Sequence, residues 1–200
     1  MFDYLAQEVF SHLPAGMQDF LLRTSIVDYL PMPLAGLLTG LPTSAAEGRM
    51  TVPAVVEELR KKNLFLTAGN DEEMVVRFHA LFRDFLQKTL VARTKPAEVK
   101  RLYTTAANFF RQNSDPVRAV NLHLASGQFE KAALQIEACG RELIARGQTQ
   151  TILRWIETLP LDFQDARDIA QVLFRPAFAV VLQLFNDHVL RGGESCLIIG

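Results

Sequence analysis

The sequence contains only two cysteines, Cys139 and Cys196, which are too far apart to form a paired redox or metal motif. This argues against a disulfide-stapled secreted scaffold and favours reduced thiols in the cytoplasm. The chain also lacks an excess of charge of one sign, because 21 Lys and Arg against 22 Asp and Glu give a formal net charge of -1. The composition therefore gives no sign of a surface built for nucleic acid.

Long hydrophobic runs are also missing. Charged side chains such as Asp3 and Glu8 interrupt the N-terminal residues, which therefore do not form the apolar segment of a secretory signal. The most apolar later stretch, residues 172–185, contains an arginine and a proline and is shorter than the roughly 20 residues that cross a bilayer. We interpret it as a buried helix and expect a cytoplasmic protein without a membrane partner.

No catalytic or metal-binding motif is present. The glycines form neither of the phosphate-binding patterns G-x-x-x-x-G-K-[ST] and G-x-G-x-x-G, and there is no G-x-S-x-G nucleophile elbow. The histidines are isolated from one another and from the cysteines, so no metal-ligand spacing occurs. We expect a non-enzymatic protein, with no metal and no cofactor bound by this chain alone.

What the sequence does contain is helical periodicity. Apolar residues follow the i, i+3, i+4 spacing over residues 2–13. Pro14 then starts a new helix, which continues over 18–27. A shorter helix can end at Gly40, where left-handed backbone geometry costs little. Thr51 can cap the helix over residues 51–63.

The next segment carries the pattern of a β hairpin. Two short apolar or β-branched runs, 64–67 and 74–78, flank the polar, turn-forming insert 68–73. Three helices followed by a hairpin is the order of a winged helix, a small helix-turn-helix variant with a β wing. We therefore predict a winged-helix domain over residues 1–92, closed by a helix over 79–92.

Residues 93–200 are predicted to form a second, helical domain. An apolar stripe over 99–110 indicates one helix, Asp115 begins the next, and Gly127 turns the chain. Alanines recur at contact positions as in tetratricopeptide-like (TPR-like) solenoids, without a strict 34-residue repeat. Residues 160–200 match this pattern poorly. The predicted fold class is thus mainly α: a winged helix with a small β hairpin, followed by a TPR-like α-solenoid.

His79 is the first candidate binding residue, at the point where the hairpin meets the next helix and close to Arg77. Helix N-termini bind anions, and each charge-assisted hydrogen bond contributes about 1.5–3 kcal/mol. Spacing alone fits a simpler interpretation better, in which His79 bonds a backbone carbonyl. The core side chains of that helix are then Leu81, Phe82, Phe85 and Leu86.

The second candidate is the basic end of the helix over 51–63, which has the position of a recognition helix. Arg60, Lys61 and Lys62 could contact phosphates or bases there. Two glutamates on the same helix repel a nucleic-acid backbone, however. DNA binding by this segment is therefore less favoured than a solvated or domain-packing face.

Several segments together resemble a known family. They are residues 2–6, 13–14, 18–25, the wing strand 63–66, the motif around His79, and 119–123, 125–127, 132–133 and 153–156. As a set they are similar to the region downstream of the nucleotide-binding domain in the large MalT-like, LuxR-type transcriptional regulators of the STAND ATPase class. The resemblance covers almost the whole chain.

This resemblance implies a regulatory segment of an ATP-dependent transcriptional regulator. The winged helix would fold onto a nucleotide-binding domain of the same or a partner chain, where the histidine matching His79 contacts the phosphate of bound ADP in the resting state. The helical arm would bind an inducer or a protein, and ADP or ATP would be the cofactor of a complete protein. The related switch motif reads Met-His-Asp against Phe78-His79-Ala80 here, so only His79 carries over.

Two alternatives remain open from the residues. One is a stand-alone winged-helix DNA-binding protein, which rests on residues 51–63. The other is a TPR-like interaction scaffold built on residues 97–159. The family's ATPase core and its C-terminal DNA-binding helix-turn-helix do not accompany these residues, so we also expect a fragment or a truncated gene product.

Overall fold

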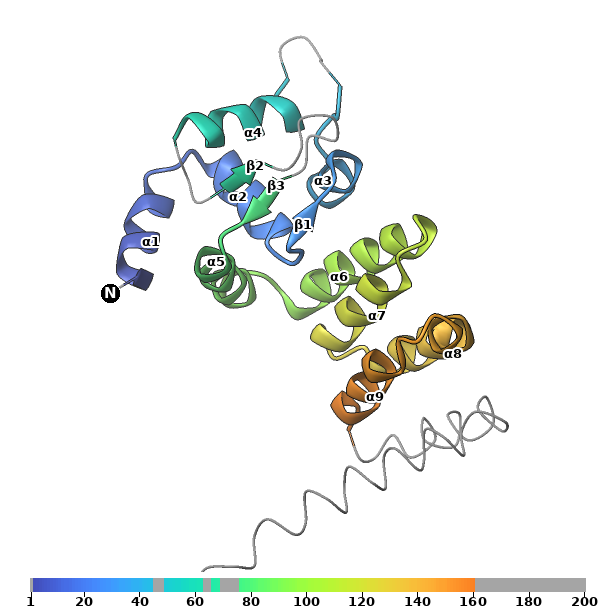
Figure 1. The fold of residues 1–200 in the computed structure, drawn as a ribbon. Coiled ribbons are helices and arrows are strands. Elements are labelled where there is room, and N and C mark those ends of the chain that lie inside the picture. Colours follow the sequence, from blue (N-terminus) through green and yellow to red (C-terminus); the bar gives the residue numbers. More distant parts are fainter. Residues whose placement is uncertain (1, 45–48, 63–65, 69–75, 161–200) are drawn as a thin grey trace, which may run out of the picture. The chain divides into compact units, whose positions relative to one another are not determined.

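The computed structural model describes residues 2–44, 49–62, 66–68 and 76–160. In chain order (Figure 1) these residues form α1 (Phe2–Ser11), α2 (Ala15–Thr24), β1 (Tyr29–Leu30), α3 (Met32–Thr39), α4 (Val52–Lys61), β2 (Leu66–Ala68), β3 (Val76–Phe78), α5 (Ala80–Arg93), α6 (Pro96–Gln112), α7 (Pro116–Ala125), α8 (Phe129–Ala145) and α9 (Thr149–Thr158). The predicted mainly α fold class is confirmed. The chain divides into two compact units, Met1–Leu122 and His123–Gly200.

The first unit contains a small antiparallel sheet in the order β1-β3-β2. The predicted hairpin is β2–β3, in which Leu66 pairs with Phe78 and Ala68 with Val76. The sequence did not predict β1, where Tyr29 pairs with Arg77. A two-residue strand is too short to show alternation, and it forms here because β3 offers a free edge for pairing.

The ends of the helices in this unit follow local sequence signals. The N–H of Ala54 donates to the hydroxyl of Thr51 at 3.4 Å, so Thr51 caps α4 as predicted. Gly40 ends α3 with φ at 76°, also as predicted. Helix α2 starts directly after Pro14, as predicted, but it ends at Thr24, before the predicted end at Val27.

Packed phenylalanine rings form part of the core of the first unit. Phe82 and Phe85 of α5 stack with their ring centroids 6.2 Å apart, and Phe10 of α1 meets Phe85 edge-on at 5.8 Å. The prediction that Leu81 belongs to this core was wrong, since its side chain is 54% exposed. With 3.6 residues per turn, Leu81 lies about 100° around the helix from Phe82 and so outside the buried face.

Helix α6 is tied to the helices of the winged-helix region. Arg23 of α2 forms an ion pair with Glu98 of α6 at 3.1 Å, and α6 also packs against α3 and α5. Gln87 of α5 donates to the carbonyl of Ser25 at 2.8 Å. The compact unit therefore extends to Leu122. The domain boundary between residues 92 and 93 stays a prediction.

The second unit is described over residues 123–160, where α8 and α9 pack against each other. The buried side chains of these two helices are Ala132, Ala133, Ile136, Cys139, Leu143, Ile152 and Trp155. Gly127 and Gly147 adopt positive φ values of 65° and 75° in the turns before α8 and α9. Paired helices with alanines at the contact fit the predicted TPR-like arm.

Some predicted features lie outside the described residues. They include the polar insert from residue 69 onward, the apolar helix over 172–185 and Cys196. In the part of the chain that the structure describes, no helix has the length and apolar character needed to span a membrane.

Candidate functional site

His79 occupies the junction between β3 and α5. Its backbone is extended (φ -60°, ψ 134°) at the N-cap position, and its carbonyl accepts the N–H of Arg83 at 3.0 Å. The imidazole does not cap the helix, and the residue is exposed. His79 is therefore a surface residue at a helix start and can be reached by another molecule.

The alternation of β3 continues into this junction. Arg77 is exposed, Phe78 is buried and His79 is exposed, as expected when successive side chains point to opposite faces. Phe78 thus anchors the strand in the core and leaves Arg77 and His79 on the outer side. The first N–H groups of α5 have no acceptor within the helix. A guanidinium, an imidazole and helix N–H donors are the groups that bind anions at helix N-termini.

The basic residues of α4 lie at its C-terminal end. Arg60 is half-buried, whereas Lys61 and Lys62 are exposed. Cations at this position interact favourably with the helix dipole, which accounts for them without a ligand. In helix-turn-helix proteins the N-terminal residues of the recognition helix contact the bases. A role of these three residues in DNA binding stays a prediction.

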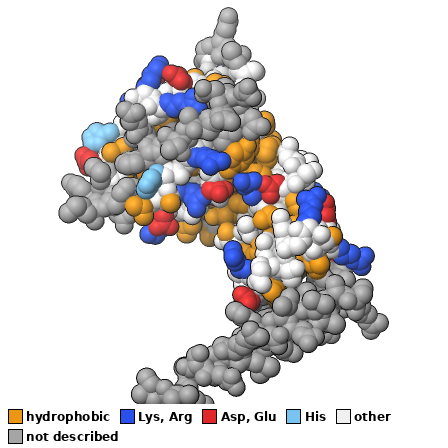
Figure 2. All heavy atoms as spheres, in the orientation of Figure 1, with side chains coloured by type: hydrophobic (Ala, Val, Ile, Leu, Met, Phe, Trp, Pro, Cys, Tyr) orange, Lys and Arg blue, Asp and Glu red, His pale blue; other side chains and the backbone are white. Residues whose placement is uncertain are grey.

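Charged side chains of both signs lie next to one another on the face of the molecule drawn in Figure 2. Ion pairs within single helices also join Asp19 to Arg23 and Asp84 to Lys88, each at 2.8 Å. Mixed charge of this kind suits a solvated surface better than a polyanion-binding one.

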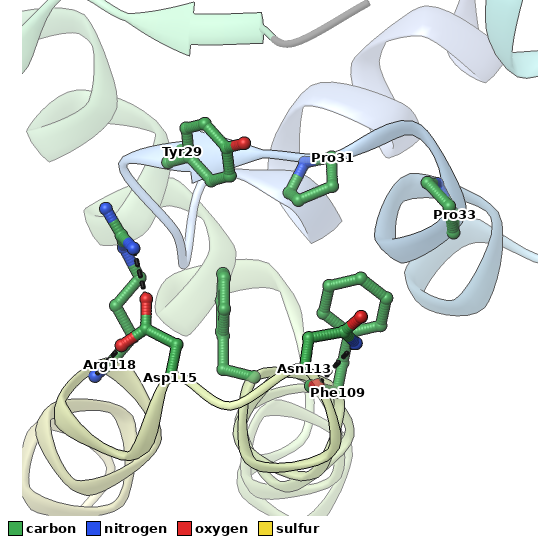
Figure 3. A pocket seen from close by; sticks show the side chains of 8 residues that line it. Tyr29, Pro31, Pro33, Phe109, Asn113, Asp115 and Arg118 are labelled. Atoms are coloured by element: carbon green, nitrogen blue, oxygen red, sulfur yellow. Dashed lines mark hydrogen bonds and ion pairs between the residues drawn. The ribbon is translucent and has the colours of Figure 1, made fainter. Parts of the chain in front are cut away.

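A pocket that the sequence did not predict lies within the first unit (Figure 3). Its volume is about 470 Å³. One side is formed by Tyr29, Pro31 and Pro33 around β1 and the start of α3, and the other side by residues of α6, α7 and their connection. The second set comprises Phe109, Phe110, Asn113, Asp115 and Arg118.

The polar end of this pocket is organised by Asp115. One of its carboxylate oxygens accepts the backbone N–H of Arg118 at 3.0 Å, which confirms that Asp115 caps α7, and the other pairs with the Arg118 guanidinium. The guanidinium carbon lies 5.0 Å from the ring centroid of Tyr29 and 5.7 Å from that of Phe110. Arg118 therefore connects the sheet side of the pocket to its helical side.

The shifted pKa values describe structural groups. The hydrogen bond from Arg101, with a further contribution from Arg23, lowers the pKa of Glu98 from 4.5 to about 2. Burial raises the pKa of the Tyr103 hydroxyl and of the Cys139 thiol, so both stay protonated at neutral pH. A protonated, buried thiol is a poor nucleophile. Over the described residues, no three His, Cys, Asp or Glu side chains gather to hold a metal ion.

The comparison with family models agrees with this geometry of helices, hairpin and closing helix. The model described as MalT winged helix domain matches residues 6–99, from α1 to the first turn of α6. Residues 6–99 are thus similar to a MalT winged helix domain. The resemblance noted from the sequence is thereby confirmed, and His79 lies inside the matched region.

Curated relatives extend this similarity into the helical arm. The chain is 29% identical over 153 residues to the HTH-type transcriptional regulator MalT of Vibrio cholerae, covering 76% of this chain and 16% of the relative. It is 26% identical over 162 residues to MalT of Vibrio campbellii, covering 81% and 17%. It is also 29% identical over 158 residues to the serine/threonine-protein kinase PknK of Mycobacterium tuberculosis, covering 79% and 13%.

This chain therefore spans between 13% and 17% of the length of these relatives. The names of the relatives, two transcriptional regulators and a kinase, describe much longer proteins. The similarity to these relatives covers 153 to 162 residues of this chain and so reaches beyond the region that the family model matches.

Proposed function

We propose that this chain is a non-enzymatic regulatory segment of a LuxR-type transcriptional regulator. In this proposal the MalT winged helix domain packs onto a nucleotide-binding domain of the same or a partner chain and holds it in the ADP-bound resting state. The observation that supports it is the exposed position of His79 at the start of α5, with Arg77 exposed two residues earlier.

His79 would donate a hydrogen bond to a phosphate oxygen of ADP. A charge-assisted hydrogen bond contributes about 1.5–3 kcal/mol, which corresponds to a ten- to hundredfold change in an equilibrium constant. Moving a two-state switch from 1:99 to 99:1 takes about 5.5 kcal/mol. His79 would therefore supply a substantial part of the bias, and further contacts between the domains would supply the rest.

The helical arm would carry the signal. Stacked helix pairs build extended surfaces that receive ligands or proteins, and we assign the binding of an inducer or a partner protein to the helices that follow the winged helix. Direct DNA binding by α4 is not favoured, because Lys61 and Lys62 lie at its C-terminal end and the same helix carries two glutamates, Glu57 and Glu58.

The test uses a protein that joins this segment to a nucleotide-binding domain and drives a transcriptional reporter. His79→Ala should raise reporter expression without inducer by about ten- to hundredfold, because the resting state loses its phosphate contact. His12→Ala is the matched control, since His12 is also exposed but bonds Glu8 in its own helical turn. Basal expression that is equal in all three proteins would refute the sensor role of His79.

A further inference from the structure

The pocket between the β1–α3 segment and the α6–α7 connection has the features of a small-molecule site. Its volume of about 470 Å³ falls within the range of about 300–1,000 Å³ that is usual for ligand pockets. All eight lining residues belong to the first unit, and they come from two segments far apart in the sequence. A ligand there would contact both segments at once.

The walls of the pocket are flat. Five of the eight lining side chains are rings: Tyr29, Pro31, Pro33, Phe109 and Phe110. Aromatic rings stack on one another in offset or edge-on arrangements and bury large apolar areas. A planar aromatic ring therefore fits these walls.

The polar side chains decide the charge of the ligand. Both carboxylate oxygens of Asp115 are already engaged, one by the backbone N–H of Arg118 and one by its guanidinium. A cationic ligand would have to compete for this carboxylate. A guanidinium carries five N–H donors, more than the pair with Asp115 uses, and the Arg118 side chain is 41% exposed. An anionic ligand could thus accept hydrogen bonds from the Arg118 guanidinium. A cationic ligand would face the Asp115 carboxylate, whose oxygens are already bonded to Arg118.

A second guanidinium, that of Arg77, contacts the Tyr29 ring but belongs to the His79 corner and does not line the pocket. The guanidinium carbon of Arg77 lies 5.9 Å from the ring centroid of Tyr29, the same ring that Arg118 approaches. Among the residues that line the pocket, Arg118 is therefore the one whose guanidinium can receive an anionic group. Guanidinium groups are well suited to carboxylates because their planar forks can bond both oxygens.

We propose that this pocket binds a planar aromatic carboxylate, with the ring between Tyr29, the prolines and Phe109 and the carboxylate on the Arg118 guanidinium. Bound there, the ligand holds the α6–α7 connection against β1 and α3 and stabilises the first unit. This site is separate from the His79 corner and does not depend on the nucleotide role proposed above.

The test is an NMR titration of the 200-residue chain with 2-naphthoate. A ligand of this size binds with a Kd on the order of 1 mM, and the shifted signals should include those of Tyr29 and Phe109. The neutral 2-naphthalenemethanol and the non-planar cyclohexanecarboxylate should each bind at least tenfold more weakly. Equal binding of either compound would overturn the assigned chemistry, as would the absence of any shift at 10 mM, about ten times the expected Kd.

Variants distinguish binding at the Arg118 site from non-specific binding. Arg118→Gln should weaken 2-naphthoate binding about tenfold, whereas Arg111→Gln, on exposed α6 surface outside the pocket, should leave it unchanged. Asp115→Asn removes the negative charge and keeps a helix-capping side chain, so it should tighten binding. Weaker binding by Asp115→Asn, or equal binding by the two arginine variants, would overturn the proposal.

Discussion

The two units of the chain differ in how their parts are connected. In the first unit, contacts join residues far apart in the sequence: Arg23 pairs with Glu98, Gln87 bonds the carbonyl of Ser25, and β1 pairs with β3. In the described part of the second unit, α8 and α9 are neighbours in sequence, separated by the turn at Gly147. The winged helix is thus held by long-range contacts, and the described arm helices by local ones.

This difference fits the proposed division of labour. Long-range contacts fix the junction of β3 and α5, so His79 is presented in one geometry. Helix pairs held by local contacts can rearrange without disturbing that junction. Trp155, the only tryptophan of the chain, is buried in the second unit and reports on it by fluorescence.

The largest expected effect comes from the core of the first unit. Phe82 is fully buried against Phe85, so Phe82→Ala should destabilise this unit by about 3–5 kcal/mol. Urea unfolding followed by far-UV circular dichroism would show the loss. Leu81→Ala, at an exposed position next to it, should change stability by about 0.5 kcal/mol or less. If Phe82→Ala also lowered the urea midpoint that is followed by Trp155 fluorescence, the two units would unfold together. The comparison between the units would then fail.

Two glycines give a matched pair of smaller effects. Gly40 ends α3 in the first unit and Gly147 precedes α9 in the second, with φ values of 76° and 75°. An added Cβ would have open space at both, so alanine costs only the left-handed backbone, about 1–2 kcal/mol. Gly147→Ala should lower the urea midpoint that is followed by Trp155 fluorescence, whereas Gly40→Ala should leave this midpoint unchanged. The opposite pattern would contradict the division into units.

The smallest expected effect is the difference in stability lost when a long-range ion pair or a local ion pair is removed. Glu98→Gln should cost about 1 kcal/mol at pH 7, because Glu98 joins α6 to Arg23 of α2 and is less exposed than the Glu142–Arg146 pair within α8. Glu142→Gln should cost at most about 0.5 kcal/mol. Urea midpoints of the two variants measure the difference, and equal losses would remove this part of the comparison.

The pH dependence of the Glu98 contribution follows from its pKa. Folding lowers the pKa of Glu98 from 4.5 to about 2, so its stabilisation is complete above pH 4.5 and is lost as the pH falls toward 2. The stability difference between the parent chain and Glu98→Gln should therefore shrink over this range. A difference that stays constant from pH 7 to pH 2 would show that Glu98 acts by packing and not by charge.

Helices and their ends could be predicted because their signals are local. The cap at Thr51, the left-handed end at Gly40 and the cap at Asp115 each depend on a few neighbouring residues. The position of Leu81 could not be read in the same way. Helical spacing places it beside Phe82 and Phe85, but only the packed structure determines where the buried face ends.

Features that depend on residues far apart in the sequence could not be predicted from it. Strand β1 exists because Tyr29 meets Arg77 across the sheet, and the pocket exists because Tyr29 also lies opposite Arg118. Tyr29 beside two nearby prolines was a signal of an irregular, ring-rich segment, but nothing local pointed to its partners. His79 was found through a family resemblance, and the structure adds that it is exposed.

The most direct test of the account is the rate at which ADP leaves a protein that joins this segment to a nucleotide-binding domain. Fluorescently labelled ADP, chased with unlabelled ADP in a stopped-flow instrument, gives that rate for the parent, His79→Ala and His12→Ala proteins. The account predicts release about ten- to hundredfold faster in His79→Ala alone. Equal release rates in all three proteins would contradict it.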